Sequence, residues 1–207
     1  PIRIEYILDK TIEHFNIKGV RLPLKGLKIL DIGCGGGLIS EPMSRLGASV
    51  TGIDASLKNI KIAQSHSIKN NLKINYLNTS PEKMNETVKY DVILNLEVVE
   101  HVENVDLYFK SCAKLLKRNG IMFTATLNRS FTSFIKAIIG AEYILRWLPI
   151  GTHDWNKFIK PEELENLLSK VNFSTLDIKG FEFKPLSKKW ILSNDLSVNY
   201  IINSLKV

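Results

Sequence analysis

The sequence has few cysteines and no long apolar run. Two cysteines among 207 residues are too few for a disulfide framework. No stretch reaches the roughly 18 uncharged apolar residues that a membrane-spanning helix needs. No signal peptide is visible, although the chain begins at Pro1 without a methionine, which leaves room for a preceding segment. A reducing, cytoplasmic compartment is therefore expected.

The composition is otherwise that of an ordinary globular protein. Apolar residues make up 44% and charged residues 24% of the chain, which excludes intrinsic disorder for most of its length. The length fits one domain, 1–207, with an insertion near 129–155. The net charge is +7, but the basic residues are scattered at helical spacing, as at Lys58, Lys61 and Lys69. Such spacing favours a solvated helix face, and no nucleic-acid partner is expected.

Strands and helices are predicted to alternate. Compact apolar runs predict five buried strands, at 27–33, 48–54, 73–78, 90–97 and 120–128. Helical periodicity predicts four helices, at 2–17, 38–46, 56–70 and 104–117. This order favours a doubly wound α/β sheet. The segments 174–185 and 196–205 are expected to pair as a final antiparallel hairpin.

A glycine-rich segment, DIGCGGG at 31–37, ends the first predicted strand. Glycines such as Gly33 and Gly35 allow a left-handed backbone and let a ligand approach the bare main chain. The following helix offers free N–H groups. Asp54, at the end of the second strand, can accept two hydrogen bonds from a ribose diol. These features predict a nucleoside-containing ligand.

Two cofactors compete for this loop. A dinucleotide motif would need glycine at Leu38, and Asp31 would repel a pyrophosphate. The Asp31 carboxylate suits a ligand with an ammonium group. The pattern therefore favours S-adenosylmethionine over a nicotinamide cofactor, while a tight turn without any cofactor is the third interpretation.

Three polar side chains follow the fourth strand. If the segment is helical, Glu97, Glu100 and His101 share one face, about 5–6 Å apart at Cβ. Two carboxylates and an imidazole can hold a divalent cation, Mg²⁺ or Zn²⁺. Alternatively His101 acts as a general base without metal. A third interpretation makes these residues a solvent-facing helix cap.

Several segments together resemble the ubiquinone-biosynthesis O-methyltransferase family. They are EVVEHV at 97–102, TLNR at 126–129, GAEYILRWLP at 140–149, GTHDW at 151–155 and KFIKPEEL at 157–164. The resemblance covers nearly the whole chain. It implies the class I methyltransferase fold, a doubly wound, seven-stranded, mostly parallel sheet with a C-terminal antiparallel strand. It also implies methylation of polyprenyl hydroxyphenols and of demethylubiquinol.

The resemblance also implies roles for individual residues. Arg3 matches an arginine that binds the methyl donor, for which the donor's carboxylate is the expected partner. Gly33 and Asp54 match the donor loop and the ribose-binding acid. Leu96 falls where the family often has methionine at the donor, a volume-conserving departure. The E-x-x-E-H pattern at 97–101 matches a metal site, for which Mg²⁺ is expected.

The insertion carries the remaining predictions. Residues 131–148 form an amphipathic pattern that ends at Pro149. The segment is expected to act as a lid that touches an anionic membrane surface through 131–149, although packing on its own domain is the alternative. His153, beside Asp154, is a second candidate base. The protein is thus expected at the inner face of the membrane, with other ubiquinone-biosynthesis enzymes as candidate partners.

Two other function classes stay open at this point. The basic charge is compatible with an RNA methyltransferase, but the segment Asn95–Val98 lacks the Asn-Pro-Pro-aromatic motif of many base-modifying enzymes. A donor-binding membrane scaffold without activity is the second alternative. The intact candidate site argues against it.

Overall fold

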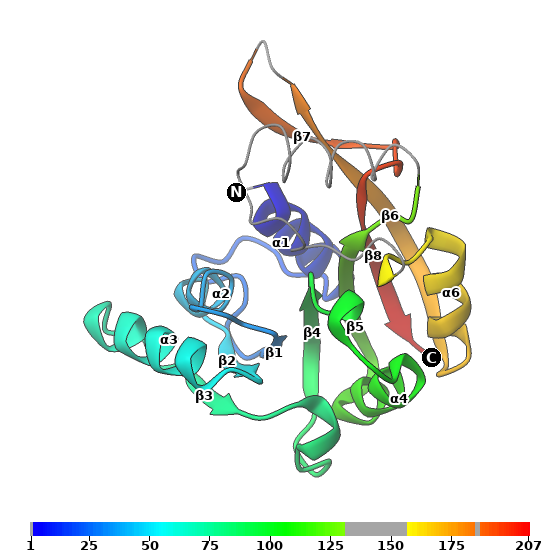
Figure 1. Ribbon diagram of the computed structural model, residues 1–207. Coiled ribbons are helices and arrows are strands. Elements are labelled where there is room, and N and C mark those ends of the chain that lie inside the picture. The colour runs from blue at the N-terminus through cyan, green and yellow to red at the C-terminus, as the bar shows by residue number, and fades with distance from the viewer. Residues whose placement is uncertain (1, 131–156, 185–186) are drawn as a thin grey trace.

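A single sheet organises the described chain. The computed structural model describes residues 2–130, 157–184 and 187–207. Its strands are β1 (Lys28–Ile32), β2 (Ser49–Asp54), β3 (Asn75–Asn78), β4 (Tyr90–Leu96), β5 (Leu116–Leu127), β6 (Phe173–Lys184), β7 (Lys189–Ser193) and β8 (Asn199–Lys206). They join in the order β3-β2-β1-β4-β5-β8-β6-β7 (Figure 1). β1 to β5 are mutually parallel, whereas β8 is antiparallel to β5 and β6, and β7 is antiparallel to β6.

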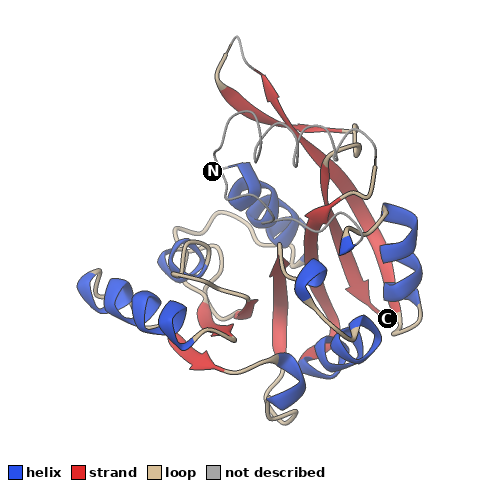
Figure 2. Cartoon of the chain, viewed as in Figure 1, coloured by secondary structure: helices blue, strands red, loops and turns tan. Residues whose placement is uncertain are grey.

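Helices lie on both faces of this sheet (Figure 2). They are α1 (Ile2–His14), α2 (Ser40–Arg45), α3 (Leu57–Lys69), α4 (Val105–Leu115) and α6 (Pro161–Ser169). Tyr6 of α1 and Met43 of α2 join a buried cluster on one face, with Val92 and Phe123. α4 and α6 bury their apolar sides in a second cluster on the other face. The sheet is therefore doubly wound, as the sequence predicts.

The predicted number of strands is wrong by one. Seven strands were expected, but β7 adds an eighth at the edge, paired with the end of β6. β7 is short, and most of its residues are exposed, so it carries no pattern of burial that the sequence could reveal. The predicted antiparallel pairing of 174–185 with 196–205 is confirmed as β6 with β8, although β7 lies between them in the chain. Helix α6 was not predicted.

The strand order determines where a ligand can bind. The chain leaves β1 toward β2 and β3 on one side, and β4 and β5 lie on the other side. The connections after β1 and β4 therefore run over opposite faces, and they leave a crevice at the carboxyl ends of these strands. The glycine loop, Asp54 and the turn after β4 all lie at this edge. The expectation that these segments meet is confirmed.

In the described ranges, every helix is too short or too polar to cross a membrane.

Candidate active site

The glycine loop after β1 adopts a backbone that favours glycine. Gly33 and Gly35 have φ angles of +66° and +53°. The backbone N–H of Cys34 donates to the carbonyl of Ile53 at 3.0 Å, which ties the loop to β2. A Cβ added at Gly33 would lie 2.4 Å from Cγ2 of Val98. The loop therefore packs directly on the turn after β4.

This packing predicts different costs for two matched substitutions. Gly33→Ala and Gly35→Ala each place a Cβ in left-handed backbone, at about 1–2 kcal/mol. Only Gly33→Ala also meets a side chain, because nothing lies within 4 Å of a Cβ at Gly35. Urea denaturation should therefore show the larger loss of unfolding free energy for Gly33→Ala. Adding Val98→Ala should restore part of it, and equal losses for the two alanine variants would contradict the contact.

Asp54 joins the loop to the start of α3. The N–H of Gly35 donates to its Oδ2 at 2.9 Å, and the N–H of Ser56 donates to its Oδ1 at 2.8 Å. Asn59 donates to the same Oδ1 at 3.3 Å. A carboxylate offers about four acceptor sites, so Asp54 keeps capacity for a further donor. Because Asp54 also lines the cavity described below, this arrangement suits a ligand diol.

Asp31 lies beneath the loop rather than in its mouth. Its side chain is buried and accepts a hydrogen bond from Oγ of Ser40 at 2.6 Å. Burial raises the pKa of Asp31 to about 6. The buried carboxylate can thus affect a ligand indirectly, through the position of the glycine loop and through its own electrostatic field. Direct contact with the donor stays a prediction.

The raised pKa predicts that Asp31→Asn stabilises the protein at neutral pH. Ionisation of Asp31 is harder in the folded chain, where its pKa is about 6, than in the unfolded chain, where an aspartate has its ordinary pKa of 3.8. The penalty is absent below about pH 4, grows as pH rises, and reaches about 3 kcal/mol above about pH 6. Urea unfolding at pH 4.5, 6 and 8 should show a gain in the variant that increases with pH. A gain independent of pH would contradict this account.

The turn after β4 is not the helix that the spacing suggested. Glu97 has a φ angle of +56°, and only a short 3-10 helix, Val99–His101, follows it. Nη2 of Arg3, from α1, lies 2.5 Å from Oε1 of Glu97. The Arg3 guanidinium also lies 5.2 Å from the ring centroid of Phe181. Arg3, expected at the donor, is therefore fixed beside the turn by a carboxylate 94 residues away in sequence.

The Glu100 carboxyl lies beside that of Glu97 and away from solvent. It is buried and accepts a hydrogen bond from Oγ1 of Thr126 at 2.9 Å. Burial, followed by the charge of Glu97, raises the pKa of Glu100 to about 7. His101 is exposed. Within 2–130, 157–184 and 187–207, no three His, Cys, Asp or Glu side chains are grouped so as to hold a metal ion. The arrangement of Glu97, Glu100 and His101 therefore does not fit the predicted metal site.

Two cavities meet at the turn. The larger, about 860 Å³, is lined by the glycine loop and Asp54, by the turn from Glu97 to Asn104, and by Thr79–Lys83. The second, about 510 Å³, lies toward α6 and is lined by Glu100, Arg129 and Phe158 among others. His101 lines both cavities. His101 therefore lies where the two cavities adjoin.

Sequence reasoning missed two groups in these cavities. Thr79–Lys83 follows β3, so the rule that ligands bind at the carboxyl ends of parallel strands would have found it. Arg129 and Glu163 form an ion pair across the second cavity. No motif or spacing signals that pair. Leu96, at the end of β4, is partly buried against the core cluster of α1 and does not line the larger cavity.

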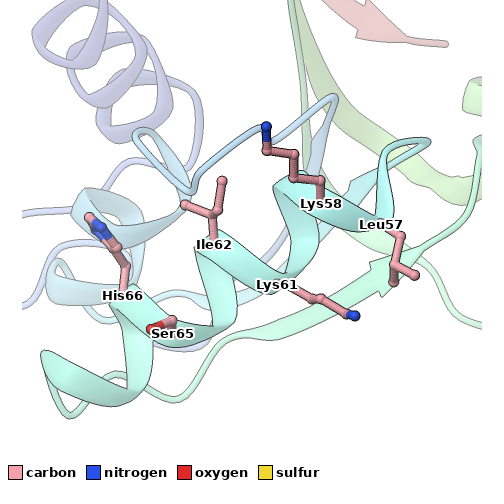
Figure 3. A pocket seen from close by; sticks show the side chains of 6 residues that line it. All are labelled: Leu57, Lys58, Lys61, Ile62, Ser65 and His66. Atoms are coloured by element: carbon pink, nitrogen blue, oxygen red, sulfur yellow. The ribbon is translucent and has the colours of Figure 1, made fainter.

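A third depression, of about 710 Å³, lies on the outer face of α3 (Figure 3). Its six lining residues all belong to this helix: Leu57, Lys58, Lys61, Ile62, Ser65 and His66. One helix surface cannot enclose a small molecule. The depression fits the predicted solvated lysine face and is separate from the site. The predictions for His153 and for the segment 131–149 lie outside the described residues.

Comparisons with known proteins agree with this geometry. A methyltransferase-domain family model matches residues 7–178. The ubiquinone biosynthesis O-methyltransferase of Pelagibacter ubique is 56% identical over 206 residues, which cover 100% of this chain and 86% of that protein. The Bartonella tribocorum protein of the same name is 53% identical, over 98% of this chain and 83% of its own.

Solved structures establish the fold independently. Magnesium protoporphyrin IX methyltransferase from Synechocystis PCC 6803, solved with bound S-adenosylhomocysteine, has a TM-score of 0.69 at 19% identity. The match covers 99% of this chain and 82% of that chain. The expected class I methyltransferase fold is thereby confirmed. Because a relative of that name is 56% identical over 100% of this chain, the chain belongs to the family of ubiquinone biosynthesis O-methyltransferases.

Proposed function

We propose that the protein methylates the phenolic hydroxyl of polyprenyl hydroxyphenol and demethylubiquinol intermediates, with S-adenosylmethionine as the donor. Family membership supports O-methylation in ubiquinone synthesis. The observation that carries the proposal is the place of His101, on the wall shared by the donor-sized cavity and the second cavity. A base in that position can serve an acceptor hydroxyl that faces the donor.

The chain's own residues fit the donor. Gly33, which is left-handed, brings backbone without a Cβ to the cavity, and Asp54 has free acceptor capacity for a hydroxyl of the ribose diol. Arg3 provides a cation beside Glu97 that suits the donor's carboxylate. When bound, S-adenosylmethionine supplies an electrophilic methyl group on a sulfonium.

His101 then has a defined proton to accept. A phenol with a pKa near 10 is mostly protonated at neutral pH, so its oxygen is a weak nucleophile. A neutral imidazole within hydrogen-bond reach takes the hydroxyl proton as the oxygen gains the methyl group. Because His101 is exposed, it can pass this proton to water after turnover. His153 is the alternative base and lies outside the described residues.

Assistance by Mg²⁺ or another divalent ion remains a separate hypothesis. Glu97 is paired with Arg3, and Glu100 is buried on Thr126, so no step is derived through a metal. Turnover that collapses with a chelator and returns with Mg²⁺ would restore the metal hypothesis for Glu97, Glu100 and His101. Turnover that ignores the chelator leaves His101 as the base.

Attachment to the membrane is likewise proposed for the insertion. A polyprenylated acceptor partitions into the bilayer, so an enzyme acting on it gains from contact with anionic lipid through residues 131–149. We propose that this contact attaches the protein peripherally at the inner face, beside other enzymes of ubiquinone synthesis. Flotation with anionic vesicles tests it.

The experiment for the main proposal is a product assay. The protein is incubated with the donor and, separately, a prenylated diphenol, the same compound with both hydroxyls blocked, and RNA. Mass spectrometry should show one added methyl on the diphenol alone. Methylated RNA would support the nucleic-acid alternative. Donor binding with no product from any acceptor would support the scaffold alternative.

A further inference from the structure

The hairpin of β6 and β7 presents an apolar face. Its cross-strand pairs include Phe181 with Leu192 and Phe183 with Trp190. Directly opposed residues project to the same side of an antiparallel pair, so these four side chains share one face. The Phe183 and Trp190 rings lie 5.4 Å apart between centroids. Their exposed fractions are 43% and 52%, which is high for neighbouring aromatic residues.

A cavity of about 270 Å³ separates this face from the start of α1. Its apolar wall consists of Ile2, Ile4, Ile39, Phe181 and Trp190. The backbone of Phe181 is held by Asn199, whose Oδ1 accepts the Phe181 N–H at 3.3 Å. The cavity wall therefore joins the start of α1 to the hairpin of β6 and β7, and its apolar lining continues onto the exposed ring of Phe183.

One end of this cavity reaches the proposed active site. Arg3 lines the cavity and pairs with Glu97, which lines the larger cavity with His101. An apolar lining thus extends from the Arg3–Glu97 pair to the exposed aromatic pair of the hairpin. Its polar end lies at Glu97, on the cavity that shares His101 with the second cavity, and its apolar end suits a hydrocarbon chain.

We propose that this groove binds the isoprenoid tail of the acceptor. The inference rests on the proposed function, because that function supplies an acceptor with a polar ring and an apolar tail. Burial of the tail against Trp190 and Phe183 removes apolar surface of both partners from water. The groove would therefore raise affinity for tailed acceptors without contacting the reacting oxygen.

Kinetics with two acceptors test the groove. The diphenol head is used bare and with a two-isoprene tail that stays dissolved. Trp190→Ala and Phe183→Ala should each raise KM for the tailed acceptor about tenfold, leave kcat unchanged, and leave the bare acceptor unaffected. Leu57→Ala, which removes an equally exposed apolar side chain on α3, is the matched control and should change nothing. Equal effects on both acceptors, or none, would overturn the proposal.

A binding measurement keeps the test independent of turnover. The tailed acceptor should shift the emission of Trp190 to shorter wavelength, a change that is lost in Trp190→Phe and absent with the bare head. No shift in the native protein would overturn the groove even if methylation occurs. A shift without methylation would support the groove and reject the proposed function. Defects seen only with vesicle-bound acceptor would assign the hairpin to a lipid surface instead.

Discussion

Asp54→Ala is expected to weaken binding of S-adenosylhomocysteine by about 100-fold. A hydrogen bond to a charged group contributes about 1.5–3 kcal/mol, and Asp54, which already accepts three, keeps room for one from the ribose diol, so about 100-fold is the upper end for that bond. The variant also frees the N–H groups of Gly35 and Ser56, which Asp54 now holds at 2.9 and 2.8 Å. Isothermal titration with S-adenosylhomocysteine measures the effect directly.

A second aspartate provides the matched control. Asp91, at the start of β4, also accepts a backbone N–H, from Lys28, and pairs with Lys117. It lies at the amino ends of β1 and β4, the opposite edge of the sheet from Asp54. Asp91→Ala should therefore leave ligand affinity unchanged, whatever it costs in stability. An affinity for Asp54→Ala within threefold of the native value would remove Asp54 from the donor site.

His101→Ala is expected to lower kcat by about 100- to 10,000-fold while donor affinity stays the same. The side chain lies on the wall of both cavities, where it can accept the acceptor's proton. Without it, the reaction depends on the fraction of acceptor already ionised. The residual rate should therefore rise tenfold per pH unit until the phenol's pKa, near 10. Single-turnover rates between pH 6 and 10 reveal this slope.

His66→Ala is the control for the loss of a histidine. His66 is exposed on the outer face of α3, apart from both cavities (Figure 3). This variant should keep native kcat and the native pH profile. Should His101→Ala retain native kcat, the base would have to be another group, of which His153 is the remaining candidate from the sequence.

The sheet as far as β5 was predictable because buried parallel strands are nearly continuous apolar runs. The glycines at 31–37 end one such run, and Asp54 ends the next, so the donor edge followed from spacing alone. β7 escaped prediction because Trp190, Ile191 and Leu192 are all at least 37% exposed and show no alternation of burial. An edge hairpin that leaves apolar residues uncovered has no periodic signal.

The turn after β4 is a second feature that sequence reasoning did not predict correctly. Helical spacing predicted a helix that carries Glu97, Glu100 and His101, but a left-handed residue at Glu97 and a short 3-10 turn take its place. The Arg3–Glu97 pair joins residues 94 positions apart, which local pattern cannot predict. Asp31 is buried beneath the loop because its strand lies in the middle of the sheet, and its contact with the donor stays a prediction. Tertiary packing determined each of these outcomes.

The most direct test of methyl transfer to oxygen is the position of the transferred carbon. The protein is supplied with S-adenosylmethionine labelled with ¹³C in its methyl group and with a prenylated diphenol, and the product is analysed by NMR. The proposed chemistry predicts one new aromatic methoxy signal, which disappears in His101→Ala at neutral pH. A labelled methyl on a ring carbon, or an unlabelled diphenol despite donor binding, would contradict it.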